Sequence, residues 1–364
     1  MTRTRAAILE SRNAPLSVRE VSLSEPMERE VLVKMEMAGL CRSDLNAIVG
    51  HTRYDMPLVL GHEGAGTVVR TGKGVTSLKE GDRVVLSWAA FCGDCFFCKK
   101  GLNHQCHTVA WPRGKGLLPD WTTRFSEGDN PIFHFNGVSS FSEYTVVYET
   151  GCVKVDDGIP FEVASVVGCS VVTGIGAVYN TANVEEGSTT LVVGGGNVGM
   201  SVIQALKIKG AALIIAVDPK AEKHTAIKDA GADIVLSDIS IDEIRKATGG
   251  FGVDYAFDGA ATEETLNASL AAVRRAGTVV MVGSPHPLAK YSVQPIEFHL
   301  EKKIIGSLYG SSNPVRDIPR LLEFYRQGRL KLDGFTAGSY RLEEINAAIK
   351  ALENNGGKYT ITFN

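Results

Sequence analysis

Residues 189–218 read TTLVVGGGNVGMSVIQALKIKGAALIIAVD, and this order of residue types predicts the fold of the second half of the chain. The segment holds an apolar strand at 191–193, a glycine cluster, and a second apolar strand at 212–217. Between the two strands, one face of a helix carries Val198, Val202, Ala205 and Leu206. A strand, a glycine turn, a helix and a second strand together predict a β–α–β unit of a parallel sheet.

The glycine turn of this segment is a candidate dinucleotide site. Gly194, Gly196 and Gly199 occupy the positions of a G-x-G-x-x-G motif, with Asn197 and Val198 inside it. Only glycine lets the backbone come close to a pyrophosphate, and the following helix N-terminus supplies amide donors and partial positive charge. A turn with a purely structural role is the alternative interpretation.

Asp218 ends the second strand, at the distance expected for a carboxylate that binds the adenosine ribose hydroxyls. A carboxylate there repels a 2′-phosphate, so the sequence favours NAD over NADP. Lys220 and Lys223 nearby would soften that preference.

Strand-like runs continue beyond this unit as ADIVLSD, VDYAFDGA and GTVVMVGS, with helical segments between them. This alternation predicts an α/β fold with a doubly wound parallel sheet, a Rossmann domain. Residues 30–90 instead contain short β-branched runs broken by glycine and charge, which predict a compact, mainly β domain. We place the mainly β domain at 1–170, the Rossmann domain at 171–308, and a return to the first domain at 309–364.

The composition is that of an ordinary globular protein, with 44% hydrophobic and 22% charged residues in 364. A formal net charge of -3 gives no electrostatic reason to expect nucleic acid or an anionic membrane as a partner. The N-terminal residues do not resemble a secretory signal, and we expect no apolar run as long as a membrane span. A cytoplasmic location follows, in which the seven cysteines are thiols or metal ligands rather than disulfides.

Four cysteines lie in the stretch CGDCFFCKKGLNHQC at 92–106. Their spacing on a loop rich in glycine and asparagine favours a closed tetrahedral zinc site that stabilises the loop. The ligands would be Cys92, Cys95, Cys98 and Cys106. An iron–sulfur cluster is the main alternative, although the fourth cysteine is distant and no proline follows it; free thiols are a third interpretation.

Cys41, Cys152 and Cys169 remain. Cys41 precedes the stretch GHEGAG at 61–66, which holds His62 and Glu63, and Cys169 precedes the dinucleotide unit. Two thiolates and an imidazole would hold a zinc ion with a fourth position open for substrate. Because these residues are far apart in the chain and a buried cysteine is usually an inert small hydrophobe, the residues alone do not establish this grouping. We interpret Cys152 as such a buried thiol.

The order of CRSD, GHEGAG, the four-cysteine loop, GCSVVTGIGA and GGGNVG resembles that of the zinc-dependent medium-chain alcohol dehydrogenases over essentially the whole chain. The segment after the cysteine loop, about 111–141, is similar to the branch that includes the liver-type and glutathione-dependent formaldehyde enzymes. The resemblance implies a GroES-like catalytic domain and a Rossmann domain. It also implies NAD and two zinc ions per chain, one catalytic and one structural.

The same resemblance implies residue roles. The catalytic zinc ligands would be Cys41, His62 and Cys169; Asp44 would orient the ligand histidine, and Glu63 would lie beside the metal. Ser43 would pass on the alcohol proton. The cofactor would contact Arg42, Thr173 and Lys223 in addition to the glycine turn and Asp218. Pocket positions would be Trp88, Trp111, Phe135 and Ser284, whose large rings favour an apolar, even aromatic, substrate.

Two departures from the family pattern bear on function. Asn46 stands where many relatives have the histidine that ends the proton relay, which leaves direct release to water or a route through His51. Ala110 stands where the formaldehyde branch has a glutathione-binding arginine, and Arg113 is close but in a different local context. A glutathione adduct is therefore a disfavoured substrate.

The sequence thus predicts an enzyme that transfers hydride between a primary or secondary alcohol, aromatic or allylic among the options, and NAD. The alternatives are a form that keeps its nicotinamide bound, a glutathione-dependent formaldehyde dehydrogenase, and a non-catalytic zinc- and NAD-binding protein. The partner would be a small alcohol, aldehyde or ketone, and the branch implies a homodimer.

Overall fold

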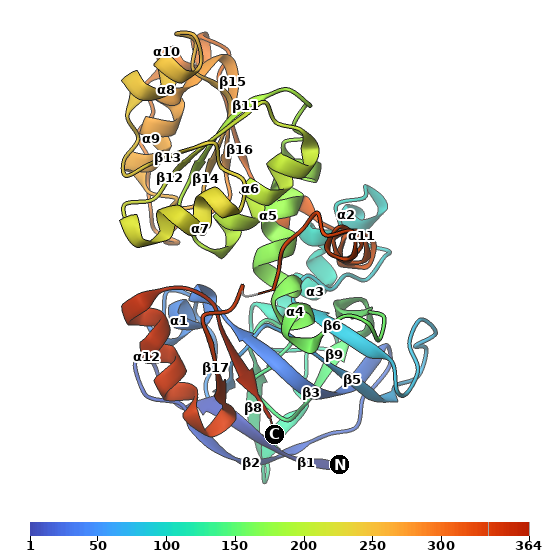
Figure 1. Cartoon of the computed structure of the whole chain (residues 1–364). Coiled ribbons are helices and arrows are strands. Elements are labelled where there is room, and N and C mark those ends of the chain that lie inside the picture. The colour runs from blue at the N-terminus through green and yellow to red at the C-terminus, as the bar shows by residue number, and fades with distance from the viewer. Residues whose placement is uncertain (334, 364) are drawn as a thin grey trace. The chain divides into compact units, whose positions relative to one another are not determined.

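The computed structural model describes residues 1–333 and 335–363, and the chain divides into two compact units (Figure 1). Unit 1 contains Met1–Cys169, Asn313–Leu322 and the described residues from Leu332 onward. Unit 2 contains Ser170–Ser312 and Glu323–Lys331. Residues 309–312 and 323–331, which the sequence-based division assigned to the returning segment, belong instead to unit 2.

Unit 1 is mainly β, as the short β-branched runs predict. A closed barrel has the strand order β1-β2-β7-β8-β4, and these strands are Thr2–Leu9, Ser17–Leu23, Phe125–Glu127, Asn130–His134 and Leu58–Val59. Its interior is filled by apolar side chains that alternate along the strands, among them Ile8, Leu23 and Phe125.

A second sheet of unit 1 has the order β10-β6-β5-β3-β18-β17, and β9 also pairs with β3. These strands are Cys152–Lys154, Arg83–Ser87, Glu63–Thr71, Glu30–Leu40, Tyr359–Thr362, Gly338–Arg341 and, for β9, Tyr144–Tyr148. The C-terminal strand β18 pairs antiparallel with β3, so the end of the chain completes the sheet that begins near its start. The helices of this unit are α1 (Arg42–Ile48), α2 (Phe96–Lys99), α3 (His107–Arg113), α4 (Phe161–Val166) and α12 (Ile345–Asn355).

Unit 2 contains a parallel six-stranded sheet of order β13-β12-β11-β14-β15-β16. The strands are Ile234–Leu236, Leu213–Val217, Thr189–Val193, Val253–Asp258, Val273–Met281 and Lys303–Gly306. Numbered from β11, this is the 3-2-1-4-5-6 order of a dinucleotide-binding Rossmann fold, as predicted.

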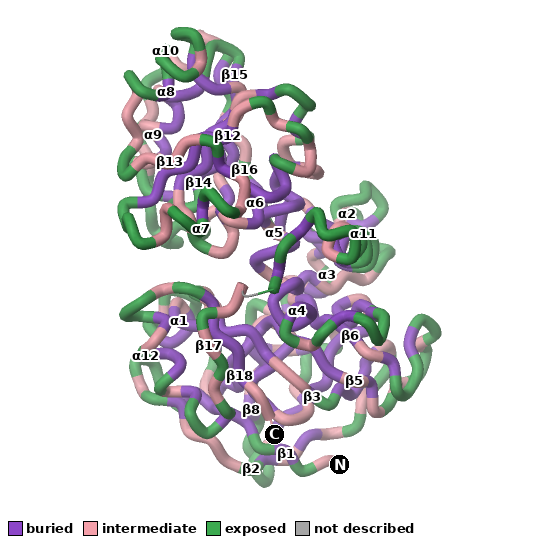
Figure 2. The backbone as a smooth tube through the Cα atoms, viewed as in Figure 1, coloured by how far each residue is buried: buried purple, intermediate pink, exposed green. Residues whose placement is uncertain are grey.

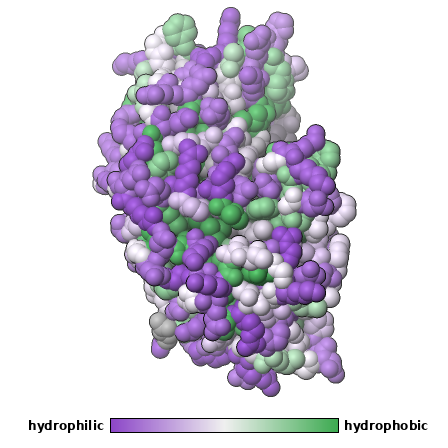
Figure 3. All heavy atoms as spheres, turned by 90° about the vertical axis from the view of Figure 1, so that its right-hand side faces the viewer, coloured by the Kyte–Doolittle hydropathy of each residue, from purple (hydrophilic) through white to green (hydrophobic). Residues whose placement is uncertain are grey.

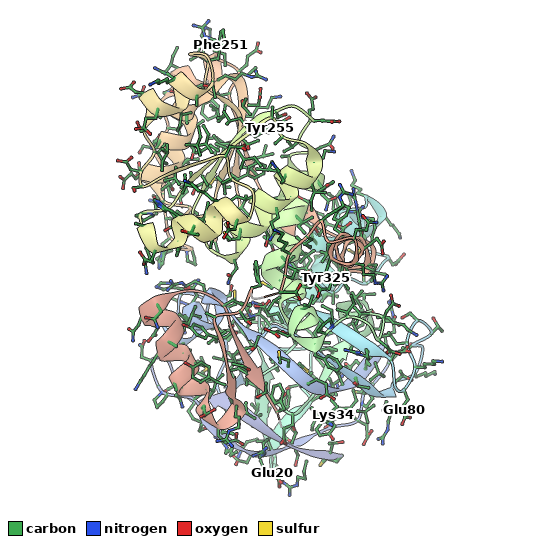
Figure 4. All side chains as sticks on the ribbon, in the orientation of Figure 1. Glu20, Lys34, Glu80, Phe251, Tyr255 and Tyr325 are labelled. Atoms are coloured by element: carbon green, nitrogen blue, oxygen red, sulfur yellow. The ribbon has the colours of Figure 1, made fainter. Side chains whose placement is uncertain are left out.

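Helices cover both faces of this sheet: in Figure 1, α6 and α7 lie on one side, and α8 and α9 lie on the other. Their bounds, with α5 and α10, are Asn197–Lys209, His224–Asp229, Ile241–Ala247, Glu263–Ala272, Val172–Gly176 and Pro295–His299. The central strands are mostly buried (Figure 2) because both faces are covered. By contrast, Phe251 points outward from the turn before β14 and is 78% exposed (Figure 4).

One helical stretch corrects an expectation. Residues Phe161–Thr181 have a mean hydropathy of 1.8 and are long and apolar enough to span a membrane, although the sequence-based analysis expected no such run. Of that window, 78% is buried inside the protein, as is typical of a core helix. It contains α4, α5 and two π-helical segments, Val167–Val171 and Ala177–Thr181. Helix α11 (Pro314–Arg326) has residues in both units.

Candidate active site and zinc sites

Three elements of unit 1 bring Cys41, His62, Glu63 and Cys169 together. Cys41 caps the N-terminus of α1, and Cys169 lies in the π-helical segment Val167–Val171. His62 immediately precedes β5, and Glu63 is the first residue of that strand. Their ligand atoms lie within 4.8 Å of one another. Cys41 and Cys169 are 128 positions apart in the chain. The fold nevertheless brings them together with His62, as the hypothesis of a catalytic zinc site requires.

Glycine at position 61 is a geometric requirement of this cluster. Gly61 has φ +88°, and a Cβ there would lie 2.4 Å from Ser140 Oγ and 2.6 Å from the Phe141 backbone nitrogen. Only glycine adopts this conformation without strain and leaves room for the neighbouring backbone. The turn therefore fixes the direction in which His62 enters the cluster.

The donor set fits a zinc ion. His62 is buried, and among the described residues its Nε2 has no hydrogen-bond partner; the same holds for Glu63 Oε2. Buried polar atoms without partners are rare, and two of them beside two thiols point to a bound cation. Two cysteines and a histidine are the ligands of a catalytic zinc, with one position free for another ligand.

Asp44 orients the ligand histidine. It is fully buried, and its Oδ1 lies 3.1 Å from His62 Nδ1 and accepts a hydrogen bond from the Gly61 amide at 3.2 Å. Its Oδ2 accepts from the Cys41 amide at 2.9 Å. One carboxylate thereby fixes the backbone of both segments and directs Nε2 of His62 toward the thiols.

Glu63 is paired with a lysine that the sequence-based analysis did not identify. Lys358 is buried immediately before the last strand, β18, and its Nζ donates a hydrogen bond to Glu63 Oε1. Burial raises the pKa of Glu63 to about 7, while the Lys358 ammonium opposes that rise. The pair holds one carboxylate oxygen on the lysine and leaves the other toward the thiols and His62.

The pKa values of the ligand groups are shifted by their mutual contacts. A hydrogen bond with Cys169 lowers the pKa of Cys41 well below its usual range, and the same bond raises that of Cys169. Burial works to lower the pKa of His62, but the Asp44 carboxylate outweighs it and the net shift is upward. A thiolate is therefore already favoured at this cluster, and thiolates are the metal-binding form of cysteine.

The four-cysteine loop forms the second cluster. The sulfur of Cys98 lies 4.0 Å from that of Cys92 and 3.6 Å from that of Cys95, and the Cys95 and Cys106 sulfurs are 3.8 Å apart. Four sulfurs at about 2.3 Å from one zinc ion would be separated by about 3.8 Å. The spacing therefore fits a single tetrahedral ion.

An aromatic wall lies beside the first cluster. Phe135 is buried, and its ring meets the His62 ring edge-on at 5.5 Å and the Tyr54 ring at 5.2 Å. Trp88 is partly buried and packs against the same core. Trp111, in contrast, is 67% exposed and lies against His107 with ring centroids 5.2 Å apart.

In unit 2 the glycine turn has the geometry that a dinucleotide needs. Gly194 has φ +97°, and a Cβ at Gly199 would lie 1.8 Å from the Gly194 carbonyl oxygen, so helix α6 can begin this close to β11 only with glycine. Gly196 caps α6, with Asn197 and Val198 in its first turn. The helix N-terminus is thus left open for a phosphate.

Asp218 ends β12 and is buried, and its Oδ2 accepts hydrogen bonds from the Gly195 amide at 2.8 Å and from Lys223 Nζ at 3.0 Å. Burial works against ionisation of Asp218, but these bonds and the one from the Lys220 amide lower its pKa. The carboxylate is therefore ionised beside the glycine turn, where a ribose would lie.

The other candidate residues are distributed over the two units. Ser43 and Asn46 are partly buried in α1, whereas Arg42 and His51 are exposed. Thr173, which is partly buried, and Ser284, which is exposed, belong to unit 2.

A Rossmann unit with a zinc-type cluster of two thiols and an imidazole in the other unit defines a class, the metal-dependent nicotinamide dehydrogenases. Comparison with known proteins agrees with this class. Residues 27–157 match the alcohol dehydrogenase GroES-like domain family, and residues 197–327 match the zinc-binding dehydrogenase family.

Relatives similar over the whole chain narrow the class further. An S-(hydroxymethyl)glutathione dehydrogenase of Synechocystis sp. is 34% identical, over 97% of each chain. Among solved structures, an alcohol dehydrogenase zinc-binding domain protein from Burkholderia ambifaria is 33% identical, with a TM-score of 0.95 over 100% of this chain and 99% of that one. Benzyl alcohol dehydrogenase from Acinetobacter calcoaceticus is 30% identical, with a TM-score of 0.94 over 100% of both chains.

The chain belongs to the zinc-dependent medium-chain alcohol dehydrogenase family. It is an oxidoreductase that acts on CH–OH donors, and its cofactors are NAD and zinc. The four-cysteine cluster fits the structural ion, and the cluster of Cys41, His62, Glu63 and Cys169 fits the catalytic ion.

Sequence reasoning missed Lys358 and Tyr54. Lys358 is 295 residues from its partner Glu63, and no local pattern marks a lysine in GGKYT as buried. Tyr54 follows three exposed residues, 51–53, so no local pattern predicts its burial against Phe135.

Proposed function

We propose that this protein is an NAD-dependent dehydrogenase of primary aromatic or allylic alcohols. The observation that carries the proposal is the ring of Phe135, which lies in edge contact with the ligand His62 and in the same apolar core as the partly buried Trp88. Flat rings at such a wall stack well with a benzylic or allylic group. The 30% identical benzyl alcohol dehydrogenase supports the same substrate class.

The roles of individual residues follow from their positions. Cys41, His62 and Cys169 would hold the catalytic zinc, which when bound supplies a Lewis acid for the alcohol oxygen. Asp44 keeps His62 in the tautomer that presents Nε2. Ser43, in the first turn of α1, would accept the alcohol proton and pass it on.

The remaining proton route and the cofactor contacts are also part of the proposal. The Asn46 backbone carbonyl accepts a hydrogen bond from the His51 amide at 2.8 Å. Because the Asn46 side chain cannot ionise, we propose that the proton passes directly to water or through His51. We assign the pyrophosphate to the glycine turn and Arg42, the ribose to Asp218 and Lys223, and the nicotinamide side to Thr173. The pocket roles of Trp111 and Ser284 remain predictions from the family resemblance.

The test is NADH formation, followed by absorbance, with benzyl alcohol, cinnamyl alcohol and cyclohexylmethanol. Flat substrates should give at least tenfold higher kcat/KM than cyclohexylmethanol, and Phe135→Leu should reduce that preference. Thr52→Ala, an exposed position two residues from Tyr54, is the matched control. Equal kcat/KM values for all three alcohols would refute the proposal that the aromatic residues select flat substrates.

A second candidate substrate is S-(hydroxymethyl)glutathione, because a 34% identical relative carries that name. Ala110 is a departure from the glutathione-binding arginine of that branch, so we rank this substrate second. Formaldehyde oxidation with and without glutathione distinguishes the two candidates.

We also propose a cytoplasmic homodimer that exchanges NAD with solution. The edge strand β16 of the Rossmann sheet has a neighbour on one side only among the described residues, and an exposed edge of this kind can pair with a second copy. Analytical ultracentrifugation tests the dimer. Release of NAD during gel filtration separates the exchanging enzyme from one that retains its nicotinamide.

A further inference from the structure

Arg29, which immediately precedes β3, is hydrogen-bonded to the four-cysteine loop. Its Nη1 donates to the Cys92 carbonyl at 3.1 Å, although the two residues are 63 positions apart in the chain. Its Nε donates to Glu149 Oε1 at 2.6 Å, and its guanidinium carbon lies 4.9 Å from the centre of the Tyr148 ring. One partly buried side chain therefore connects a metal-ligand residue with the end of β9.

The backbone of Arg29 has an unusual conformation. Its φ is +60°, in the left-handed region that residues other than glycine seldom adopt. The Arg29 amide donates to the Lys73 carbonyl at 2.7 Å, and the Arg29 carbonyl accepts from the Glu149 amide at 2.8 Å. Glycine would form the same turn with less strain, so the turn alone does not account for an arginine at this position. Strain of this kind persists where the surrounding contacts hold the residue in place, and here those contacts include the ligand loop.

The sulfur cluster is organised around the backbone of Cys92. The Cys92 amide donates to Cys106 Sγ at 3.3 Å. The sulfur of Cys92 accepts from the amides of Asp94 and Cys95 at 3.4 and 3.3 Å. The bond from Arg29 fixes the carbonyl of this same residue, so it acts on the position of two sulfurs, that of Cys92 and that of Cys106.

A neighbouring residue holds the same segment of the loop. Thr150 Oγ1 accepts from the Phe91 amide at 2.8 Å and donates to the Phe91 carbonyl at 2.7 Å. Residues 91 and 92 are thus attached to residues 149 and 150 at two adjacent points, and Arg29 is the link at the ligand itself.

Arg29 also places a positive charge near the thiolates. Four thiolates around one zinc ion carry more negative charge than the ion neutralises. Burial works to lower the pKa of Arg29, but the hydrogen bond to Glu149 and the charges of Glu149 and Cys92 outweigh it, and the pKa is raised. The guanidinium is therefore charged where the cluster has excess negative charge.

We propose that Arg29 is a positioning residue of the four-cysteine zinc site, which fixes Cys92 through its carbonyl and places a positive charge beside its thiolate. Outer hydrogen-bonding partners of this kind orient metal ligands and tune the metal. Without Arg29, the Cys92 thiolate should leave the zinc more readily. The inference does not depend on the proposed substrate, since the four-cysteine cluster and the cluster assigned to catalysis have different ligands.

The test follows the release of zinc from the full chain, loaded with both ions, into a chelating metal indicator. Helix α2 of the loop is on the side of the molecule that faces the viewer in Figure 3, and its Phe96 is 61% exposed, so a chelator can reach the site. The ion of this site is identified as the kinetic phase that Cys98→Ser removes. We expect Arg29→Met to accelerate this phase about tenfold and to leave the other phase unchanged. Arg29→Lys should recover part of the difference, because it keeps the charge but not the planar fork.

Arg29→Gly separates the side chain from the backbone. Glycine relieves the strain at φ +60°, so the urea midpoint of unfolding of the zinc-loaded protein should be retained. We nevertheless expect zinc release as fast as from Arg29→Met. If Arg29→Gly releases zinc at the rate of the unmodified protein, the side chain has no role at the site and the proposal is overturned.

Two other cations serve as controls. Arg3 is 69% exposed and lies 3.7 Å from Glu20, so Arg3→Met should leave zinc release unchanged. Lys99 lies in the loop itself, but it is exposed and paired with Asp94 at 2.9 Å, so Lys99→Met should change the rate less than twofold. Release from Lys99→Met as fast as from Arg29→Met would show that any charge near the loop suffices, and would refute the specific role of Arg29.

Substitution of cobalt(II) for zinc reports on the thiolates directly. Removal of a nearby positive charge raises the energy of the thiolate electrons, so the thiolate-to-cobalt charge-transfer band should move to longer wavelength in Arg29→Met. It should return part of the way in Arg29→Lys. Faster zinc release with an unshifted band would mean that the substitution only loosens the packing against Tyr148, and that result would also overturn the proposal.

Discussion

Replacement of Asp44 by asparagine tests how the catalytic zinc site is assembled. The carboxylate accepts three hydrogen bonds, two at Oδ1 from Gly61 and His62 and one at Oδ2 from Cys41. If the amide oxygen takes the place of Oδ1, the amide nitrogen faces the Cys41 amide and two donors oppose each other. One charge-assisted hydrogen bond is lost, worth about 1.5 to 3 kcal/mol, and the remaining bond to His62 loses its charge.

Loss of such an orienting group costs about 10- to 100-fold in zinc affinity, or about 1.4 to 2.7 kcal/mol, in line with the hydrogen-bond estimate. We expect Asp44→Asn to release one of two zinc ions at a correspondingly lower chelator concentration, measured with a colorimetric zinc indicator. Asp157→Asn, an exposed aspartate, is the control. Zinc retention equal to that of the unmodified protein, at equal thermal stability, would refute the assigned role of Asp44.

Three further predictions concern other parts of the molecule. Cys98→Ser should remove only the structural zinc ion, so that the zinc content falls from two ions to one per chain and the melting temperature drops. A variant that keeps two zinc ions would contradict the assignment of Cys98 as a ligand. Asp218→Ala should raise the ratio of kcat/KM for NADP over NAD at least tenfold, because the buried carboxylate that repels a 2′-phosphate is lost and Lys223 is freed; an unchanged ratio in the NADH assay would place the ribose elsewhere. His134 is fully buried, and burial first and Arg124 second lower its pKa to about 3. In the unfolded chain His134 takes up a proton below a pH of about 6.5, whereas in the folded protein it stays neutral down to a pH of about 3. Between about pH 6.5 and about pH 3 it therefore reduces the free energy of unfolding by up to about 1.4 kcal/mol for each pH unit that the pH falls. His134→Gln should flatten this slope in urea titrations, and equal slopes would show that the histidine is protonated in the folded protein.

Much of the fold could be predicted because its signals are local. The glycine turn, the alternation of strands and helices around it, and the four-cysteine loop are each contained in a few tens of residues. The grouping of Cys41, His62 and Cys169 was different in kind. Spacing alone left it open, and only the resemblance to a family selected it before the structure brought the ligand atoms together.

Other features could not be predicted because they depend on long-range packing. The partner of Glu63 immediately precedes the C-terminal strand and is brought to it by the pairing of β18 with β3. The apolar helix Phe161–Thr181 was missed because its glycines and serines hide its length from a scan for continuous apolar residues.

All ligands of both metal clusters belong to one unit, and the glycine turn with its ribose carboxylate belongs to the other. The hydrogen bonds that shape the glycine turn and hold Asp218 come only from unit 2, so none of them involves a zinc ligand. Loss of zinc should therefore leave the glycine turn and its ribose carboxylate in place.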